Sequence, residues 1–218
     1  MAQAEKEADT EEYERFEKMH SPFTREETDD GRYLVTPEIE DGYGWVFEDD
    51  DVLAVEKLDG ENIAVYIDEN GEVGDIYTRE GNPVEPFGDP QYSYIVKGVI
   101  ESYNRGWLES LESGELHYGE LLGPQSQGNK YDLDEHVWVP FSYAQENFAY
   151  ESWGKYPTDY ETISGWFEES LIPLFAARAH NLSFDETGDE YVEGIIFTHP
   201  DGRMAKLRRN MFDWYSGE

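Results

Sequence analysis

The sequence predicts an α+β fold of mainly antiparallel sheets flanked by helices. Short apolar runs at strand spacing alternate with turn residues, and two longer segments carry apolar residues at three- and four-residue steps. With 218 residues, 15% of them aromatic, the chain can bury a sizeable core, and we expect one domain. Residues 1–12 are expected to form a flexible acidic tail.

The elements are predicted in chain order as follows. The pattern allows a short helix over 11–19, before the break at Ser21-Pro22. A buried strand over 52–55 is followed by alternating apolar residues from 63 to 67 and a turn at 69–71, which together predict a hairpin. Amphipathic helices are expected over 92–107 and 160–179. Further strands are expected over 116–122, 137–141, 194–198 and 204–208.

The chain is strongly acidic, with 50 acidic and 16 basic residues and a formal net charge of -34. Such a surface repels nucleic acid in dilute buffer. At about 1 M salt the Debye length falls to about 3 Å, so the repulsion is largely screened. The charge therefore favours a protein adapted to a salt-rich cytoplasm, and an acidic mimic of nucleic acid is the alternative.

Several classes of protein are excluded or disfavoured. The absence of cysteine removes disulfides, thiolate zinc sites and cysteine nucleophiles. No apolar stretch reaches the length of a membrane span, and the first residues lack the apolar centre of a signal peptide, so we expect a soluble cytoplasmic protein. The five histidines show no metal-ligand spacing. The segment GPQSQGNK fails as a P-loop because an Asn separates its last Gly from its Lys.

Lys57 is the first candidate for chemistry. It ends an apolar strand and precedes Asp59 and Gly60, so its amine is expected at the rim of a sheet where the backbone turns. That position suits a nucleophile. The alternative is a turn in which Lys57 pairs with Asp59 or Glu61.

A basic cluster forms the second candidate. Four of the 16 basic residues lie within positions 203–209, and Lys206 and Arg208 alternate on one strand face, where they could hold a phosphate. The alternative is a solvated strand edge protected by charge.

Glu120 and Glu193 each stand beside a glycine on an otherwise apolar strand. A carboxylate in such a place needs a partner. A nucleotide ribose or a hydrated Mg²⁺ would supply one, and a buried salt bridge to Arg79 or Arg105 is the structural alternative.

The order of these segments carries more information than any one of them. EKLDGEN, TREG, HYGELLGPQSQGNKY, VWVPF, EGIIF and MAKLRR follow the order and approximate spacing of motifs I, Ia, III, IIIa, IV and V of the covalent nucleotidyltransferases. The sequence resembles the RNA ligase branch of that superfamily, in particular the second phage-type family, over 52–210. Asn62 and the GELLGPQSQGNKY segment favour this branch over DNA ligases and capping enzymes.

The resemblance implies an ATP-dependent adenylation domain in which Lys57 becomes adenylylated. Lys206 and Arg208 would assist at the phosphate, and Glu193 would orient Mg²⁺ or Mn²⁺. The remaining residues are implied to bind the nucleotide, and they are Glu56, Asp59, Gly60, Asn62, Arg79, Glu120 and Phe141. Phe141 would stack on the adenine, and the backbone beside Glu56 would read its edge. The substrates would be RNA ends with a 5′-phosphate and a 3′-hydroxyl.

Two departures accompany the resemblance. Motif V commonly carries a second lysine where this sequence has Arg208, which keeps the charge but changes its geometry. The sequence ends 12 residues after Lys206, so we expect a single adenylation domain over 1–218, without a separate C-terminal domain, acting as a monomer. The alternatives are a DNA ligase or guanylyltransferase-type relative, and a non-catalytic module that binds nucleotide or nucleic acid.

Overall fold

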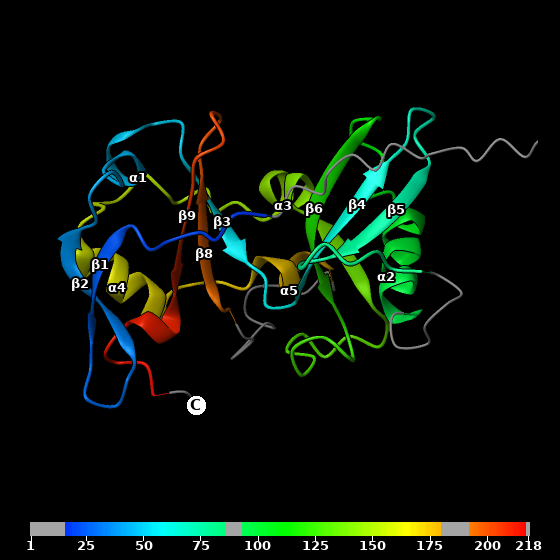
Figure 1. The fold of residues 1–218 in the computed structure, drawn as a ribbon. Helices are drawn as coiled ribbons and strands as arrows, with labels where there is room; N and C mark the ends of the chain where they lie inside the picture. Colours follow the sequence, from blue (N-terminus) through cyan, green and yellow to red (C-terminus); the bar gives the residue numbers. More distant parts are fainter. Residues whose placement is uncertain (1–15, 86–92, 180–191, 217–218) are drawn as a thin grey trace, which may run out of the picture.

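The computed structural model describes residues 16–85, 93–179 and 192–216 (Figure 1). The predicted α+β class is confirmed, because these residues form antiparallel sheets of two, three and four strands together with helices. Most of the predicted strands lie within a residue or two of their expected limits. The strands over 194–198 and 204–208 have the predicted bounds.

The three-stranded sheet has the order β3 (Leu53–Lys57), β8 (Gly194–Thr198) and β9 (Met204–Arg208). Its register places Lys57 opposite Gly194 and Gly194 opposite Arg208. Residues opposite one another in antiparallel strands share a face. The register alone therefore brings Lys57 and Arg208 to the same face and the same edge of this sheet.

The four-stranded sheet has the order β5 (Val73–Thr78), β4 (Glu61–Ile67), β6 (Glu115–Leu122) and β7 (Val137–Pro140). Helix α2 (Ser93–Asn104) packs on one face against a buried cluster that contains Ile63, Val65 and Ile67. Because side chains alternate along a strand, Asn62 and its β6 partner Glu120 lie on the opposite face. That face looks toward the three-stranded sheet (Figure 1).

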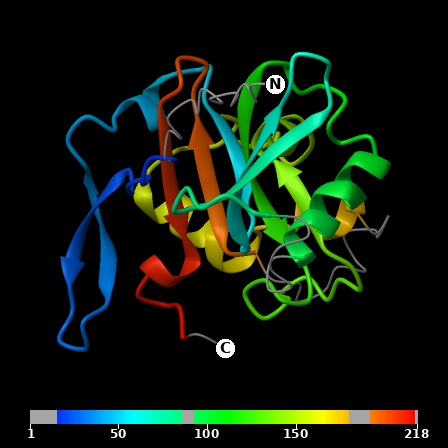
Figure 2. The ribbon, with the colours of Figure 1, turned by 45° about the vertical axis from the view of Figure 1, so that its right-hand side comes forward.

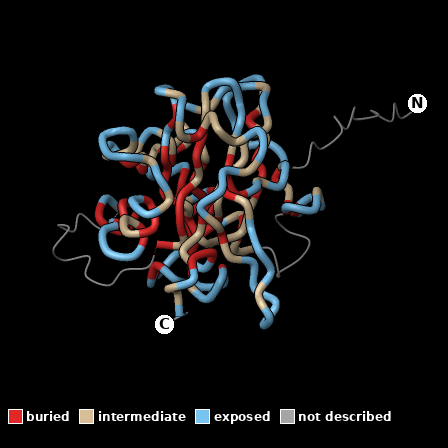
Figure 3. Tube along the Cα trace, turned by 90° about the vertical axis from the view of Figure 1, so that its left-hand side faces the viewer, coloured by how far each residue is buried: buried red, intermediate tan, exposed pale blue. Residues whose placement is uncertain are grey.

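The larger core lies around the three-stranded sheet. Helices α3 (Phe141–Asn147), α4 (Tyr160–Glu169) and α5 (Leu174–Ala179) supply or adjoin its apolar side chains, and Ile195, Phe197 and Leu207 of the sheet are fully buried. Buried backbone gathers in the middle of the molecule and exposed turns surround it (Figure 3). Short helix α1 (Trp45–Glu48) places the buried Val46 in the same core.

Two predictions about helices and one about a strand need correction. The helix expected over 160–179 is two helices, because Pro173 has no N–H to donate and disfavours helical backbone at the residue before it. Phe141 begins α3 and does not end a strand, since β7 stops at Pro140. Residues 16–19 of the helix allowed over 11–19 are not helical, and its other residues, like the tail expected over 1–12, lie outside the described residues.

A hairpin that the sequence analysis did not expect precedes all of these elements. Strands β1 (Phe23–Glu27) and β2 (Tyr33–Ile39) pair with each other and stand beside the C-terminal residues (Figure 2). Only Phe23 and Val35 of the two strands are buried. Because most of the hairpin is polar, its apolar pattern is too sparse to be recognised in sequence.

Candidate active site

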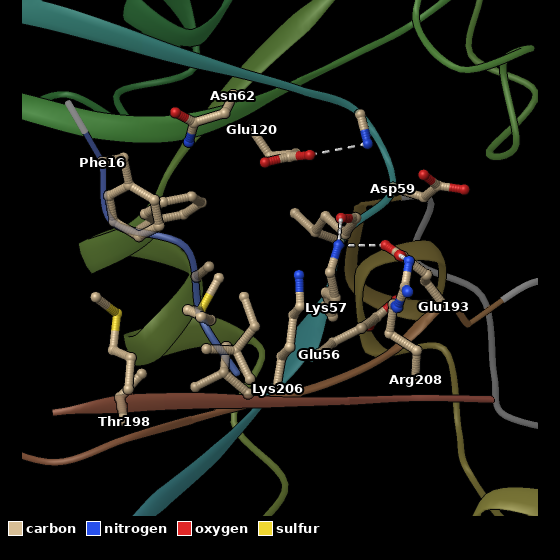
Figure 4. Close-up of a pocket in the computed structure, with 18 of the residues that line it drawn as sticks. Phe16, Glu56, Lys57, Asp59, Asn62, Glu120, Glu193, Thr198, Lys206 and Arg208 are labelled. Atoms are coloured by element: carbon tan, nitrogen blue, oxygen red, sulfur yellow. Dashed lines mark hydrogen bonds and ion pairs between the residues drawn. The ribbon is translucent and has the colours of Figure 1, made fainter. Parts of the chain in front are cut away.

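A cavity of about 320 Å³ lies between the two larger sheets (Figure 4). Every residue that the sequence analysis assigned to the site lines it, from both sheets and from the segments that follow β3 and β5. These residues are Glu56, Lys57, Asp59, Gly60, Asn62, Arg79, Glu120, Phe141, Glu193, Lys206 and Arg208. The structure thus brings together positions that are up to 152 residues apart in sequence, from Glu56 to Arg208. Their chemical roles stay predictions.

Lys57 points into this cavity from the end of β3 (Figure 4). Its side chain is 15% exposed, and Nζ donates to a carboxylate oxygen of Glu193 and to the Leu58 carbonyl, the latter at 3.3 Å. The sequence left open a pair between Lys57 and Asp59 or Glu61, but the ion-pair partner of Lys57 in the structure is Glu193. The lysine instead faces a carboxylate that comes from the far end of the chain.

The turn after Lys57 fits closely against β6. A Cβ at Gly60 would lie 2.2 Å from the Leu121 carbonyl oxygen, so only glycine fits there. The Gly60 N–H donates to Glu120 Oε1 at 3.0 Å. Burial raises the pKa of Glu120 to about 7, although Lys57 and the Gly60 N–H act in the opposite direction. Glu120 is thereby held against the turn that follows Lys57.

The opposite wall carries two cations beside Glu193. Arg208 Nη1 lies 3.7 Å from Glu193 Oε1, and Lys206 projects from the same face of β9. Burial, followed by the charges of Arg208 and Lys57, lowers the pKa of Lys206 to about 8. Burial also raises the pKa of Glu193, against the opposing effect of Lys57. The site therefore concentrates positive charge around one carboxylate, as a phosphate site requires.

The salt bridge to Arg105 that the sequence left open for Glu120 and Glu193 is wrong. Arg105 pairs with Glu101 on α2, at 2.8 Å. Glu193 pairs with Lys57 and Arg208, and Glu120 accepts from a backbone amide. Both carboxylates therefore take their partners from the cavity itself.

The end of the cavity remote from Arg208, where Figure 4 shows Phe16, is also lined by Phe141. Phe16 lies against Phe141, with ring centroids 5.1 Å apart, and residues 17–19 continue along the cavity wall. The His20 carbonyl accepts from Lys206 N at 2.8 Å, which fixes this segment beside β9. Sequence reasoning missed Phe16 because the sequence offered only a short helix over 11–19, without a function, whereas residues 16–19 are not helical.

The loop after β6 also reaches the site. The Tyr131 hydroxyl accepts from the Asp59 N–H at 2.8 Å, and Gln127 lines the cavity. Gln127, Asn129 and Asp132 all have positive φ, which is uncommon for residues other than glycine. No helix follows this loop, in agreement with its exclusion as a P-loop. Its role in the structure is to support the turn that carries Asp59.

Glu56 faces the other side of the sheet from Lys57. Its Oε2 accepts from Phe175 N at 2.7 Å, at the start of α5, and its Oε1 is buried with no hydrogen-bond partner among the described residues. Burial raises the pKa of Glu56 to about 8. Only the backbone of this residue is therefore placed to meet a ligand, as the resemblance implied.

This burial leads to a test of stability. In Glu56→Gln the amide can still accept from Phe175 N but cannot ionise. From pH 4.5 to 8 the folded wild type holds a proton that the unfolded chain releases, so wild-type stability falls relative to the variant as pH rises. The free energy of unfolding of the variant, relative to that of wild type, should grow by about 1.4 kcal/mol per pH unit, to roughly 4 kcal/mol near pH 8. Denaturant unfolding at pH 5, 6.5 and 8 measures it, and a gain that does not change with pH would contradict it.

Glu193 is the carboxylate best placed to hold a divalent cation. It is an oxygen donor on the cationic wall, and Mg²⁺ commonly uses one or two carboxylates and keeps its other positions for water and phosphate. Among the described residues, Asp49, Asp51 and His199 also bring ligand atoms within 4.8 Å of one another. They do not line the cavity, and His199 already contacts Asp49 and Asp201.

Comparison with known proteins gives one match to a family and several to structures. The RNA ligase family matches residues 50–213. No curated protein matches the sequence. A Naegleria gruberi RNA ligase solved with pyrophosphate is 16% identical with a TM-score of 0.48, over 76% of this chain and 52% of that one. A substituted form solved with ATP and Mn is 13% identical with a TM-score of 0.48, over 91% of this chain and 61% of that one.

These structural similarities are weak, and the chain spans about half the length of the first of these structures. None of the helices in the described ranges has the length and apolar character needed to cross a membrane. The family match covers both sheets of the cavity, from before β3 to beyond β9, and includes each of the eleven residues predicted for the site. By this match the chain belongs to the RNA ligase family.

Proposed function

We propose that this protein is an ATP-dependent RNA ligase in which Lys57 carries AMP. The observation that supports the proposal most strongly is the position of Lys57, largely buried between a wall with two cations and a wall with Glu120 and Asn62. A lysine nucleophile, a phosphate-binding wall and polar groups for a ribose are the parts that nucleotidyl transfer to lysine needs.

In the first step, Lys57 Nζ attacks the α-phosphorus of ATP. An N–P bond forms, the bond between the α-phosphorus and its bridging oxygen breaks, and pyrophosphate leaves with that oxygen. The attacking amine must be neutral, so its proton goes to solvent or to a neighbouring base. Lys206 and Arg208 lie where charge develops on the phosphate and would stabilise it there.

The two ends of the cavity suggest the orientation of the nucleotide. Phe141, beside Phe16, offers an aromatic surface for adenine at one end, and Arg208 offers a cation for phosphates at the other. Figure 4 shows Lys57 between Phe16 and Arg208. A divalent cation held at Glu193, Mg²⁺ or Mn²⁺, would supply Lewis acidity at the phosphate. Asn62, Arg79 and Glu120 remain the proposed contacts to the ribose or phosphate.

The later steps would join RNA. AMP would pass from Lys57 to a 5′-phosphate, and a 3′-hydroxyl would then displace AMP to form the phosphodiester. We also propose that the protein acts as a cytoplasmic monomer in a salt-rich cell, since its charge of -34 is self-repulsive at low ionic strength. A single adenylation domain stays a prediction.

The choice of polymer is the decisive test of this function. Nicks whose 3′-hydroxyl strand is RNA should be sealed at least about tenfold faster than matched all-DNA nicks, because the 2′-hydroxyl is the group by which a site distinguishes them. Denaturing electrophoresis of both substrates, in KCl from dilute to about 1 M, measures the difference. Equal or faster sealing of DNA would make the protein a DNA ligase, and labelling by GTP in preference to ATP would make it a capping-type enzyme.

A further inference from the structure

A second cavity of about 350 Å³ lies next to the proposed active site, between the β1–β2 hairpin and the residues that follow β9. Arg25 and Arg32 line it from the hairpin, and Arg208 lines both this cavity and the active-site cavity. The two views of the ribbon agree that the hairpin stands beside the C-terminal residues (Figures 1 and 2). The basic groove, defined by Arg25, Arg32 and Arg208, therefore adjoins the site of Lys57 at Arg208.

The composition of the basic groove is unusual for this chain. It takes three of the 16 basic residues, whereas none of the described residues that line it is among the 50 acidic ones. Arg32 pairs with Asp30 at 2.9 Å, and both side chains are about half exposed. An exposed pair of this kind is worth about 0 to 1 kcal/mol, so Arg32 can exchange Asp30 for another anion at little cost.

Aromatic and amide groups accompany the arginines. Tyr33 is 53% exposed, with the Arg25 guanidinium 6.0 Å from its ring centroid. Tyr215 and Asn210 line the other side of the groove. Cations interleaved with exposed aromatic rings are the lining that single-stranded nucleic acid requires, because phosphates meet the cations while bases stack on the rings.

Arg208 marks the end of the groove that meets the active-site cavity. In the active-site cavity it lies at the end remote from Phe16, whose ring contacts Phe141, and the phosphates of the nucleotide are proposed there (Figure 4). A 5′-phosphate that accepts AMP must arrive beside the α-phosphate, and the rest of its strand must leave from there. The basic groove begins at this point and leads away from Lys57.

We propose that the basic groove binds the phosphodiester backbone of the RNA strand whose 5′-phosphate accepts AMP. The β1–β2 hairpin is then a substrate-binding element that supplies Arg25 and Arg32, with Tyr33 as a stacking surface. This inference rests on the proposed RNA ligase function, and it assigns the strand to a side of the site that the nucleotide does not use.

The test compares the double variant Arg25→Ala/Arg32→Ala with wild type and with Lys97→Ala/Arg105→Ala, which removes the same charge from α2 and the turn after it. Binding of a short 5′-phosphorylated oligoribonucleotide is measured by fluorescence anisotropy at several KCl concentrations. The groove variant should bind about tenfold more weakly, and its slope of log K against log[KCl] should be shallower by about 1.4, or 0.7 for each of two lost phosphate contacts. The α2 variant should match wild type.

A second readout separates this inference from the proposed function. Self-adenylylation with ATP should be unchanged in the groove variant, whereas transfer of AMP from the labelled protein to the oligoribonucleotide should fall about tenfold at subsaturating RNA. Arg25→Lys/Arg32→Lys keeps both charges and should keep the salt slope of wild type. Unchanged binding and transfer in the alanine variant would overturn the inference while leaving the ligase standing. Wild-type protein that takes up AMP but neither binds RNA nor transfers AMP to it would overturn both.

Discussion

Lys57→Ala is expected to abolish the AMP label that the wild-type protein acquires from α-labelled ATP and a divalent cation. In the structure, the Nζ of Lys57 lies at the centre of the cavity, between Glu193 and the turn at Gly60. Loss of a covalent nucleophile removes the reaction path, so labelling should fall at least about a thousandfold. The wild-type label should resist alkali and be lost in acid, as a lysine phosphoramidate is.

Removing Lys57 also leaves the buried Glu193 with a weaker set of partners. Lys57→Met, which has a similar length and no charge, and Lys57→Arg, which keeps the charge, therefore accompany the alanine variant, and thermal unfolding shows whether each is folded. Lys155→Ala is the matched control, since Lys155 is exposed and does not line the cavity. A label that persists in any folded Lys57 variant would place the nucleophile elsewhere.

One wall of the site that the sequence predicted is set by strand register. Lys57, Lys206 and Arg208 end or occupy short apolar strands, where alternation assigns each side chain a face. Pairing of β3 with β8 and of β8 with β9 then converts three distant segments into one wall. The ordered motifs could therefore predict this wall, because side chains alternate between the two faces of a β-sheet as they alternate along the sequence.

The parts that sequence missed are held by irregular backbone. Phe16 reaches the cavity through a segment with no regular secondary structure, which the bond from Lys206 N to the His20 carbonyl ties to the sheet. Tyr131 acts through its hydroxyl, from a loop whose conformation depends on positive φ at residues other than glycine. Neither arrangement can be predicted from local periodicity, since both depend on tertiary contacts.

The break at Pro173 is a different case, because the proline itself is a signal in the sequence for the end of a helix. Apolar residues continue at helical spacing through it, and that periodicity favoured one long helix. The break allows α5 to start at Leu174 and to present the Phe175 N–H to Glu56. Glu56, the residue next to Lys57, is thus held by the start of a helix, which an uninterrupted helix would not provide.

Glu193→Ala and Lys206→Ala should each slow adenylylation by about a hundredfold to a thousandfold while the protein stays folded. Lys206 would stabilise charge developing on the phosphate, and removal of one such group typically costs this much. Glu193 would hold the divalent cation. In the structure Glu193 also pairs with Lys57, so Glu193 must release the lysine before it can attack. Single-turnover labelling at saturating ATP measures both variants.

Conservative variants distinguish these roles from a general effect on structure. Glu193→Gln keeps the size of the side chain but loses the negative charge. The variant should therefore need a higher concentration of Mg²⁺ or Mn²⁺ than wild type to reach half of its maximal labelling rate. Lys206 has a pKa of about 8, so it loses its charge as pH rises through that value, whereas an arginine stays charged. The labelling rate of Lys206→Arg relative to wild type should therefore rise above pH 8. A ratio that is flat from pH 7 to 9, together with wild-type rates in both alanine variants, would remove Glu193 and Lys206 from the reaction and leave Lys57 to act without them.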